Sequence, residues 1–371
     1  MRANEVLGIV FSNAYDKVLK ELCEIRTMGS VPFCGRYRLI DFTLSNMVNS
    51  GVSNVGIITK EHYQSLMDHV GTGRAWDLSR KNGGMVLLPP FNTATAGKNE
   101  NKVQALNGIS SFIQGSKAEY VIMTDCNVVS NFNYNDMLEF HKEKDADITI
   151  AYAHGKAPKL PDLLTFNVEG DGKLSKLAIA SETDKEVNYS IDTILIKKEL
   201  LEELIHDVVS QNKELFERDV ILANADKLKI YGYKVEGFTG VIDSLLSYYN
   251  LNMSLLAPEK CRQLFDQNAP VYTKVRDDMP TIYGLGSQVK NSLIADGCII
   301  DGEVENCILF RGVHIGKGAK VSNSIIMQGT VIEDDVTLDC VITDKNVTVS
   351  KGKSLSGVKN YPVCIGKGIV I

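Results

Sequence analysis

Short apolar segments alternate with amphipathic ones over the first 256 residues of the chain. The apolar runs predict strands at residues 6–11, 52–59, 120–124, 147–152, 189–196 and 228–235. The clearest helix is predicted over residues 198–212, because Leu201, Leu204 and Val208 share one helical face. This alternation predicts an α/β domain with a parallel sheet, which binds ligands beyond the carboxyl ends of its strands. An α+β domain without a site there is the alternative.

The pattern changes twice after residue 256. Residues 257–285 are polar, without a sustained period, and are interrupted by Pro258, Pro270 and Pro280, which predicts a linker. From residue 286 to 371 the unit Val-x-Asn-(Ser or Cys)-apolar-apolar recurs, at residues 289–294, 304–309 and 321–326, with a weaker copy near 339–342. Aliphatic residues follow a six-residue period within these copies, and glycines lie between them at corner positions. This pattern predicts a parallel β-helix rather than an antiparallel β-domain.

Composition narrows the function classes. The chain has 371 residues, 40 of them basic and 46 acidic, for a net charge of -6, and the basic residues are dispersed, which argues against nucleic-acid binding. No apolar run reaches the roughly 20 residues of a membrane helix, and the N-terminus lacks the apolar region of a signal peptide. The sequence therefore predicts a cytoplasmic protein. Its eight cysteines form no C-x-x-C pair and are predicted to be reduced thiols.

Motifs for metal or phosphate chemistry are weak. The first predicted strand leads into residues 12–17, and no glycine occurs between Gly8 and Gly29, so the usual glycine-rich phosphate cradle is missing. The six histidines have no zinc-ligand spacing. His314 lies in the repeat region, where a solvent-facing position is favoured over the catalytic role that a β-helix acyltransferase would give it. Residues 352–354 end like a P-loop, but Val347 stands where that motif needs glycine.

Two long segments carry a family resemblance. Residues 30–46, SVPFCGRYRLIDFTLSN, with Asn49-Ser50-Gly51, and the stretch from His69 through WDL (76–78) and RKNGG (80–84) to LPPF (88–91) resemble bacterial ADP-glucose pyrophosphorylase, or glucose-1-phosphate adenylyltransferase. The resemblance covers nearly the whole chain. It implies a Rossmann-like nucleotidyltransferase domain at 1–256, a linker at 257–285 and a left-handed parallel β-helix at 286–371. It also implies tetramers that act in glycogen synthesis and respond to metabolites.

The family's catalytic motifs are degenerate in this chain. Its G-G-x-G-x-R-L loop is absent, the lysine of A-K-P-A-V-P becomes Met28, and the metal aspartate of S-G-D-H becomes Cys126. Asp125 is adjacent but is expected to point to the other side of an extended strand. The lysine of E-K-P becomes Ala180, and the second metal aspartate, from W-x-D-V-G-T, has no counterpart in register across residues 236–243. No pair of metal-binding carboxylates is therefore expected.

A vestigial substrate segment remains. Ser190 matches the serine of the family's sugar-contacting A-S-M-G segment, and Asp192 replaces its glycine. Nucleotidyl transfer depends on Mg²⁺, on positioned basic groups and on backbone donors, and losing one such element costs about a hundredfold or more. We therefore expect no cofactor on this chain, with Mg²⁺ bound by a catalytic partner, and essentially no adenylyl transfer.

The resemblance then predicts a regulatory subunit. It would assemble, as a tetrameric hetero-oligomer, with a catalytic paralogue that makes ADP-glucose and pyrophosphate from ATP and glucose 1-phosphate; a homo-oligomer is the arrangement without a partner. The alternatives are an active sugar-phosphate nucleotidyltransferase with rearranged ligands around Asp125, and a stand-alone metabolite sensor. The family's positions for anionic effectors match Arg26 and Arg38, with Arg36 nearby, while another effector lysine aligns with Ile25. Ion pairs that hold the two domains together are the other interpretation of these arginines.

Overall fold

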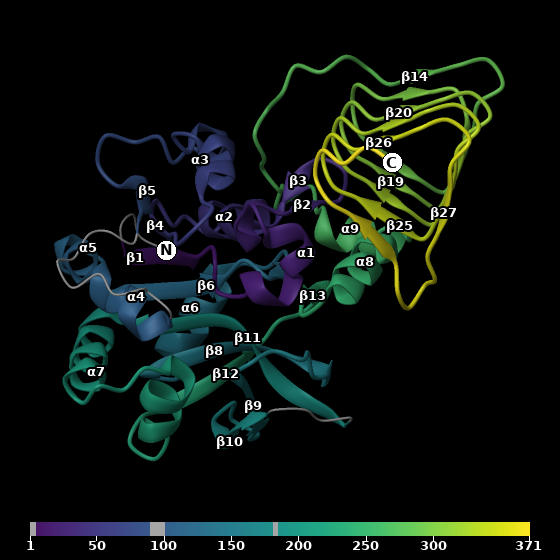
Figure 1. Cartoon of the computed structure of the whole chain (residues 1–371). Coiled ribbons are helices and arrows are strands. Elements are labelled where there is room, and N and C mark those ends of the chain that lie inside the picture. The colour runs from purple at the N-terminus through teal and green to yellow at the C-terminus, as the bar shows by residue number, and fades with distance from the viewer. Residues whose placement is uncertain (1–4, 90–100, 181–184) are drawn as a thin grey trace.

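A computed structural model describes residues 5–89, 101–180 and 185–371 (Figure 1). The two predicted domains are both present: a sheet covered by helices, and a triangular stack of short strands that ends at the C-terminus. Three parts of the chain discussed above lie outside the described residues. They are residues 1–4, Pro90 and Phe91 of the segment that resembles the family, and Ser181, which follows Ala180.

The sheet of the first domain is mixed. Its strand order is β10-β9-β11-β6-β1-β4-β5, with β8 placed between β11 and β12. The bounds are β1 Val6–Phe11, β4 Asn54–Ile58, β5 Gly84–Leu88, β6 Tyr120–Asp125, β8 Ile148–Lys156, β9 Leu163–Val168, β10 Leu174–Ala180, β11 Glu186–Lys197 and β12 Ile230–Lys234. Strands β6, β1, β4 and β5 are parallel, as predicted. The expectation of a wholly parallel sheet is wrong, because β11 runs antiparallel to β6, β8 and β9.

All six strands predicted in this domain are found, and the predicted helix 198–212 is α7, Lys198–Ser210. Strand β1 has apolar residues on both faces: Val6 and Val10 face one core, and Leu7 and Ile9 the other. Such two-sided burial explains why its sequence is a continuous apolar run rather than an alternating one.

Helices and short strands cover the sheet on both faces (Figure 1). They are η1 Asp16–Leu19, α1 Lys20–Cys23, η2 Met28–Ser30, β2 Pro32–Phe33, β3 Tyr37–Arg38, α2 Leu39–Asn49, α3 Gln64–Val70, η3 Arg74–Trp76, α4 Lys102–Gly108, α5 Ser110–Gly115, β7 Val128–Ser130, α6 Tyr134–Glu143, η4 Phe216–Ile221, η5 Leu222–Asn224, β13 Thr239–Val241 and α8 Leu245–Ser254. Within the stretch predicted as linker, α9 spans Pro258–Leu264, since proline is well suited to a first helical turn and Leu264 is buried. Residues 265–281 have no regular structure.

The second domain is a left-handed parallel β-helix built from three five-stranded sheets. One sheet holds β14 Ile282–Tyr283, β17 Ile299–Ile300, β20 His314–Ile315, β23 Val331–Ile332 and β26 Thr348–Val349. The next holds β15 Gln288–Lys290, β18 Glu303–Glu305, β21 Lys320–Ser322, β24 Thr337–Asp339 and β27 Ser354–Ser356, and the third β16 Leu293–Ile294, β19 Ile308–Leu309, β22 Ile325–Ile326, β25 Val341–Thr343 and β28 Val363–Ile365. The first strand thus begins shortly before residue 286.

The sequence repeat coincides with the coils of the β-helix. Ile308 pairs with Leu293 on one side and Ile325 on the other, so the same position of each unit stacks in register. The repeated asparagine is a corner residue: Asn306 has φ 52°, and the side chains of Asn291 and Asn306 are hydrogen bonded at 2.7 Å. Asparagine tolerates this left-handed conformation and its amides stack from coil to coil, which explains its place in the unit.

One flank of the β-helix packs directly on the sheet domain. Ile308, Phe310 and Ile325 belong to the same apolar core as the helices α2 and α8, and a turn of the sheet domain at Gly35 approaches the Leu309 carbonyl. Gly35 has φ 79°, a left-handed conformation that favours glycine, while an added Cβ would lie in ordinary contact with that carbonyl, 3.5 Å away. Within the described ranges, no helix has the length and apolar character needed to cross a lipid bilayer.

Candidate functional site

A cluster of charged side chains lies at the carboxyl ends of β1 and β6, where the fold places ligands. The Lys102 ammonium at the start of α4 lies 2.9 Å from an Asp125 carboxylate oxygen, 3.3 Å from Asp192 and 2.8 Å from Glu217. The Tyr15 hydroxyl donates a hydrogen bond to Asp192 at 2.9 Å. We call these five residues the Lys102 cluster. They come from five separate segments of the chain, including η4, which carries Glu217.

The cluster is buried, so its charged groups strongly affect one another's pKa values. Asp125 is 1% exposed and Glu217 6%. Burial, which outweighs the attraction of Lys102, raises the pKa of the Asp125 carboxyl to about 7. Burial also opposes the charge of Lys102, but the three carboxylates outweigh it and hold the pKa of Lys102 well above its ordinary value. The ammonium therefore stays charged, and the surplus negative charge of the cluster favours a proton on Asp125.

The turn after β1 is closed by the chain's own hydrogen bonds. The Ser12 hydroxyl donates to the Ile58 carbonyl at 2.7 Å. The Asp16 carboxylate accepts hydrogen bonds from the Asn13 side-chain amide and from the Met28 backbone amide, both at 2.6 Å. Burial raises the pKa of Asp16 to about 6. The turn thus holds a carboxylate, Asp16, where a glycine-rich loop would present backbone amides to phosphate.

The degenerate positions found in the sequence lie beside this cluster, not within it. Met28 is buried, and its backbone is held by Asp16. The Cys126 sulfur packs against Gly29, where an added Cβ would be 3.1 Å away. Burial, and after it the charge of Asp125, raises the pKa of the Cys126 thiol well above its ordinary value. Ala180 ends β10, and its side chain lies outside the described residues.

The vestigial substrate residues are part of the internal network. The Asp192 backbone amide donates to the Ser190 hydroxyl at 3.0 Å, and Asp192 has φ 53° at the point where β11 slips in register against β8. This irregularity turns Asp192 toward Tyr15 and Lys102. Its carboxylate oxygens are thus engaged by the protein itself.

The sequence predicts no pair of metal-binding carboxylates at this edge, yet acidic side chains do gather there. Three carboxylates converge, although from positions that family motifs do not mark. Glu217 comes from η4, which carries no recognisable motif. One feature of the local sequence could have indicated the role of Lys102. A cation in the first turn of a helix is disfavoured by the helix dipole, so its position there suggests a nearby anionic partner.

The cluster as arranged does not fit a divalent metal ion. The family implies Mg²⁺, but the Lys102 ammonium already stands at the point where the three carboxylates meet. Within the described part of the molecule, the Asp125 carboxylate has no hydrogen-bond partner apart from its ion pair with Lys102. Across residues 5–89, 101–180 and 185–371, no group of three His, Cys, Asp or Glu side chains is arranged to hold a metal ion.

The junction between the domains has the opposite charge balance. The Arg26 guanidinium donates two hydrogen bonds of 2.8 Å to the Asp344 carboxylate of the β-helix, and both side chains are 2% exposed. Arg38 donates to the Ser65 carbonyl and hydroxyl at 2.5 and 3.0 Å. Of the three arginines matched to effector positions, Arg26 is thus engaged by the chain, Arg38 is partly buried and Arg36 is exposed.

The charges around this pair are mostly positive. Burial, followed by the nearby Arg38 and Arg26, lowers the pKa of Lys345 to about 7, and burial lowers the pKa of Arg38 to about 10. Arg311 is 7% exposed, and its Nε and Nη2 have no hydrogen-bond partner among the described atoms. Arg311 lies 3.7 Å from the Asp278 carboxylate, which partly balances its charge, whereas Lys345 has two further cations beside it.

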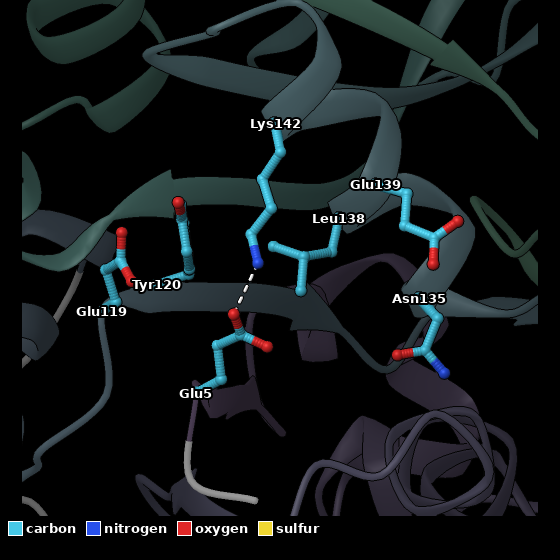
Figure 2. Close-up of a pocket in the computed structure, with 7 residues that line it drawn as sticks. All are labelled: Glu5, Glu119, Tyr120, Asn135, Leu138, Glu139 and Lys142. Carbon is cyan, nitrogen blue, oxygen red and sulfur yellow. Dashed lines mark hydrogen bonds and ion pairs between the residues drawn. The ribbon is translucent and has the colours of Figure 1, made fainter. Parts of the chain in front are cut away.

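A shallow pocket of about 410 Å³ lies at the other edge of the sheet, where β1 and β6 begin (Figure 2). Figure 2 shows Lys142 pointing toward Glu5, with their charged atoms 2.5 Å apart, and Tyr120 beside them. Its remaining lining is Glu119, Asn135, Leu138 and Glu139. Because it lies at the amino ends of the strands, this pocket is away from the position at which the fold binds nucleotides.

Comparisons with known proteins agree with this architecture. The family model "Nucleotidyl transferase" matches residues 19–160, and "GlmU-like, C-terminal hexapeptide" matches residues 281–359. "Glycogen biosynthesis protein GlgD" of Bacillus subtilis is 35% identical over 367 residues, which cover 99% of this chain and 97% of that protein. The chain belongs to the glucose-1-phosphate adenylyltransferase family.

Other relatives carry two different names. A "Glycogen biosynthesis protein GlgD" of Geobacillus stearothermophilus is 38% identical over 317 residues, 85% of this chain and 82% of the relative. The "Glucose-1-phosphate adenylyltransferase" of Clostridium acetobutylicum is 32% identical over 324 residues, 85% of this chain and 84% of that enzyme. The resemblance to the adenylyltransferase family is thus confirmed, and the family includes proteins named for glycogen biosynthesis.

Proposed function

We propose that this chain is a regulatory, catalytically impaired subunit of glucose-1-phosphate adenylyltransferase in glycogen biosynthesis. The observation that carries the proposal is the Lys102 cluster, which fills the carboxyl edge of the sheet with the protein's own charges. In this proposal the chain assembles with a catalytic paralogue that converts ATP and glucose 1-phosphate to ADP-glucose and pyrophosphate, and modulates its rate. Mg²⁺ is then bound by the catalytic partner.

Electrostatics at the cleft support the loss of catalysis. ATP brings several negative charges, which a functional site neutralises with metal ions, lysines and backbone donors. Here Asp16, Asp125, Asp192 and Glu217 face the same region, and the nearby Lys102 is already shared among three of them. A bound triphosphate would meet net repulsion and would have to break a buried ion-pair network.

The domain junction supports the regulatory part of the proposal. An anionic effector would find Arg38 and Lys345 near the buried Arg26–Asp344 pair, with the exposed Arg36 two residues before Arg38. Arginine recognises phosphate and carboxylate groups through paired donors, and burial strengthens such contacts. Because Arg26 and Asp344 join the two domains, an anion that competes for Arg26 would alter how the β-helix is held.

The test compares this chain, its catalytic paralogue and the two together. With ATP, glucose 1-phosphate and Mg²⁺, we expect the isolated chain to form ADP-glucose at a rate at least a hundredfold below the paralogue. The mixture should co-elute as one oligomer and should differ from the paralogue alone in rate or in effector response. Turnover by the isolated chain at the paralogue's rate would refute catalytic impairment. Separate elution with unchanged kinetics would refute the regulatory role.

A further inference from the structure

We propose that Lys102 is a built-in cation: its ammonium takes the position among Asp125, Asp192 and Glu217 that a divalent metal ion would otherwise occupy, so the cleft needs no metal and admits none. The proposal concerns the internal chemistry of the cleft. It stands whether or not the chain regulates a partner.

The convergence of the three carboxylates is the first observation. Asp125 ends β6, Asp192 lies in β11 and Glu217 lies in η4, so no local sequence constraint brings them together. Each is less than a tenth exposed. Buried carboxylates repel one another unless a cation or a proton neutralises them, and the Lys102 ammonium supplies a positive charge in contact with all three.

The contacts of the ammonium are the second observation. Lys102 Nζ contacts one oxygen of each carboxylate at 2.8 to 3.3 Å, which matches the three donors of an ammonium group. Metal–oxygen bonds would be about 2.0 to 2.6 Å, so a metal ion would draw the same oxygens closer together. Metal and ammonium are therefore mutually exclusive at this point.

The surroundings of the ammonium complete the argument. Nζ lies 5.9 Å from the ring centroids of both Phe11 and Tyr15, whose faces stabilise a cation. The Lys102 side chain is only 16% exposed, and its helix is anchored by the Asn101 side chain, which accepts the Gln104 backbone amide. The lysine is thus held in place from its own helix as well as by its three partners.

The experiment uses MnCl₂ as the probe, with electron paramagnetic resonance for bound Mn²⁺ and thermal unfolding for stability. The variants of the full chain are Lys102→Met and, as matched control, Lys142→Met, which removes a lysine from the half-exposed pair with Glu5. We expect no Mn²⁺ bound by the wild type or the control at millimolar metal. Lys102→Met should unfold about 5 to 10 °C lower without metal, bind Mn²⁺, and regain part of the loss when Mn²⁺ is added.

A second variant keeps the test decisive if Lys102→Met does not fold. Lys102→Met/Asp192→Asn removes one positive and one negative charge together, so it should fold and retain Asp125 and Glu217 as weaker Mn²⁺ ligands. Mn²⁺ bound by the wild type as tightly as by Lys102→Met would overturn the proposal. So would a folded variant lacking Lys102 that gains no Mn²⁺ binding, because the ammonium would then be an ordinary ion-pair partner.

Discussion

The cleft and the domain junction are both built around buried ion pairs, yet their charge balances are opposite. At the cleft one lysine serves three carboxylates, so the region is short of positive charge. At the junction the buried Asp344 carboxylate pairs with Arg26, while Arg38 and Lys345 lie nearby with Asp41 as a second buried carboxylate, so three cations face two buried carboxylates. The first region is closed to anions by its own side chains, whereas the second attracts them. Under the proposed function, anion binding is disfavoured where catalysis would occur and favoured where the domains meet.

The largest effect is expected from removing the charge of Asp344, the carboxylate that pairs with Arg26. Asp344→Asn should lower the free energy of unfolding by about 3 to 5 kcal/mol, because it leaves buried Arg26 beside two further cations. Denaturant unfolding at neutral pH measures the change. Asp77→Asn is the control, since its exposed pair with Arg80 is expected to cost less than about 1 kcal/mol. Equal effects of the two substitutions would contradict the unequal burial described here.

A pH titration tests the acidic side of the comparison. The folded-state pKa of Asp16 is about 6, above the ordinary value of 3.8, so the folded chain holds this proton more tightly than the unfolded chain. Its contribution is therefore fully present below about pH 4 and is lost as pH rises through about 6, amounting to about 3 kcal/mol. Asp16→Asn should reduce by that amount the loss of stability between pH 4 and 7, the rest of which comes from groups such as Asp125, whose pKa is raised to about 7. If the pH dependence of the unfolding free energy were the same in Asp16→Asn and the wild type, the pKa of Asp16 would not be raised by burial.

The smallest expected effect concerns an anion at the junction. Millimolar inorganic phosphate should stabilise the wild type, and Arg38→Ala should weaken phosphate binding about tenfold, since it removes a fixed pair of donors. Thermal unfolding over a phosphate series gives both dissociation constants. Arg80→Ala, on the exposed surface, should bind phosphate as the wild type does. Phosphate binding that is the same in all three proteins would place the anion elsewhere.

Much of the architecture follows from local pattern. The apolar runs locate six strands of the sheet, and the six-residue period locates the coils, because each depends on which residues a single element buries. The direction of β11 was not predicted, since an apolar run has the same pattern in parallel and antiparallel strands. The helix α9 was also missed, because its seven residues show too little periodicity.

The two charged sites could be predicted from the sequence only in part. The absence of a glycine cradle after β1 was visible directly in the sequence. Asp16 binds groups that are 3 and 12 positions away, and Lys102 meets Glu217, which is 115 positions away. No motif records such a contact. Arg26 was matched to an effector position, but its partner Asp344 lies in a different domain and became evident only from the packing.

The shared apolar core between the sheet domain and the β-helix has a consequence for the connection between them. Cohesion of the two halves comes from packed side chains and the Arg26–Asp344 pair, and residues 274–280 of the connecting segment are exposed (Figure 1). The polypeptide link there is itself bound to both halves, because the Lys274 ammonium donates to the Asp68 carbonyl and Asp278 lies 3.7 Å from Arg311. Attachments at its exposed side chains that leave these two contacts intact should not change how the halves sit.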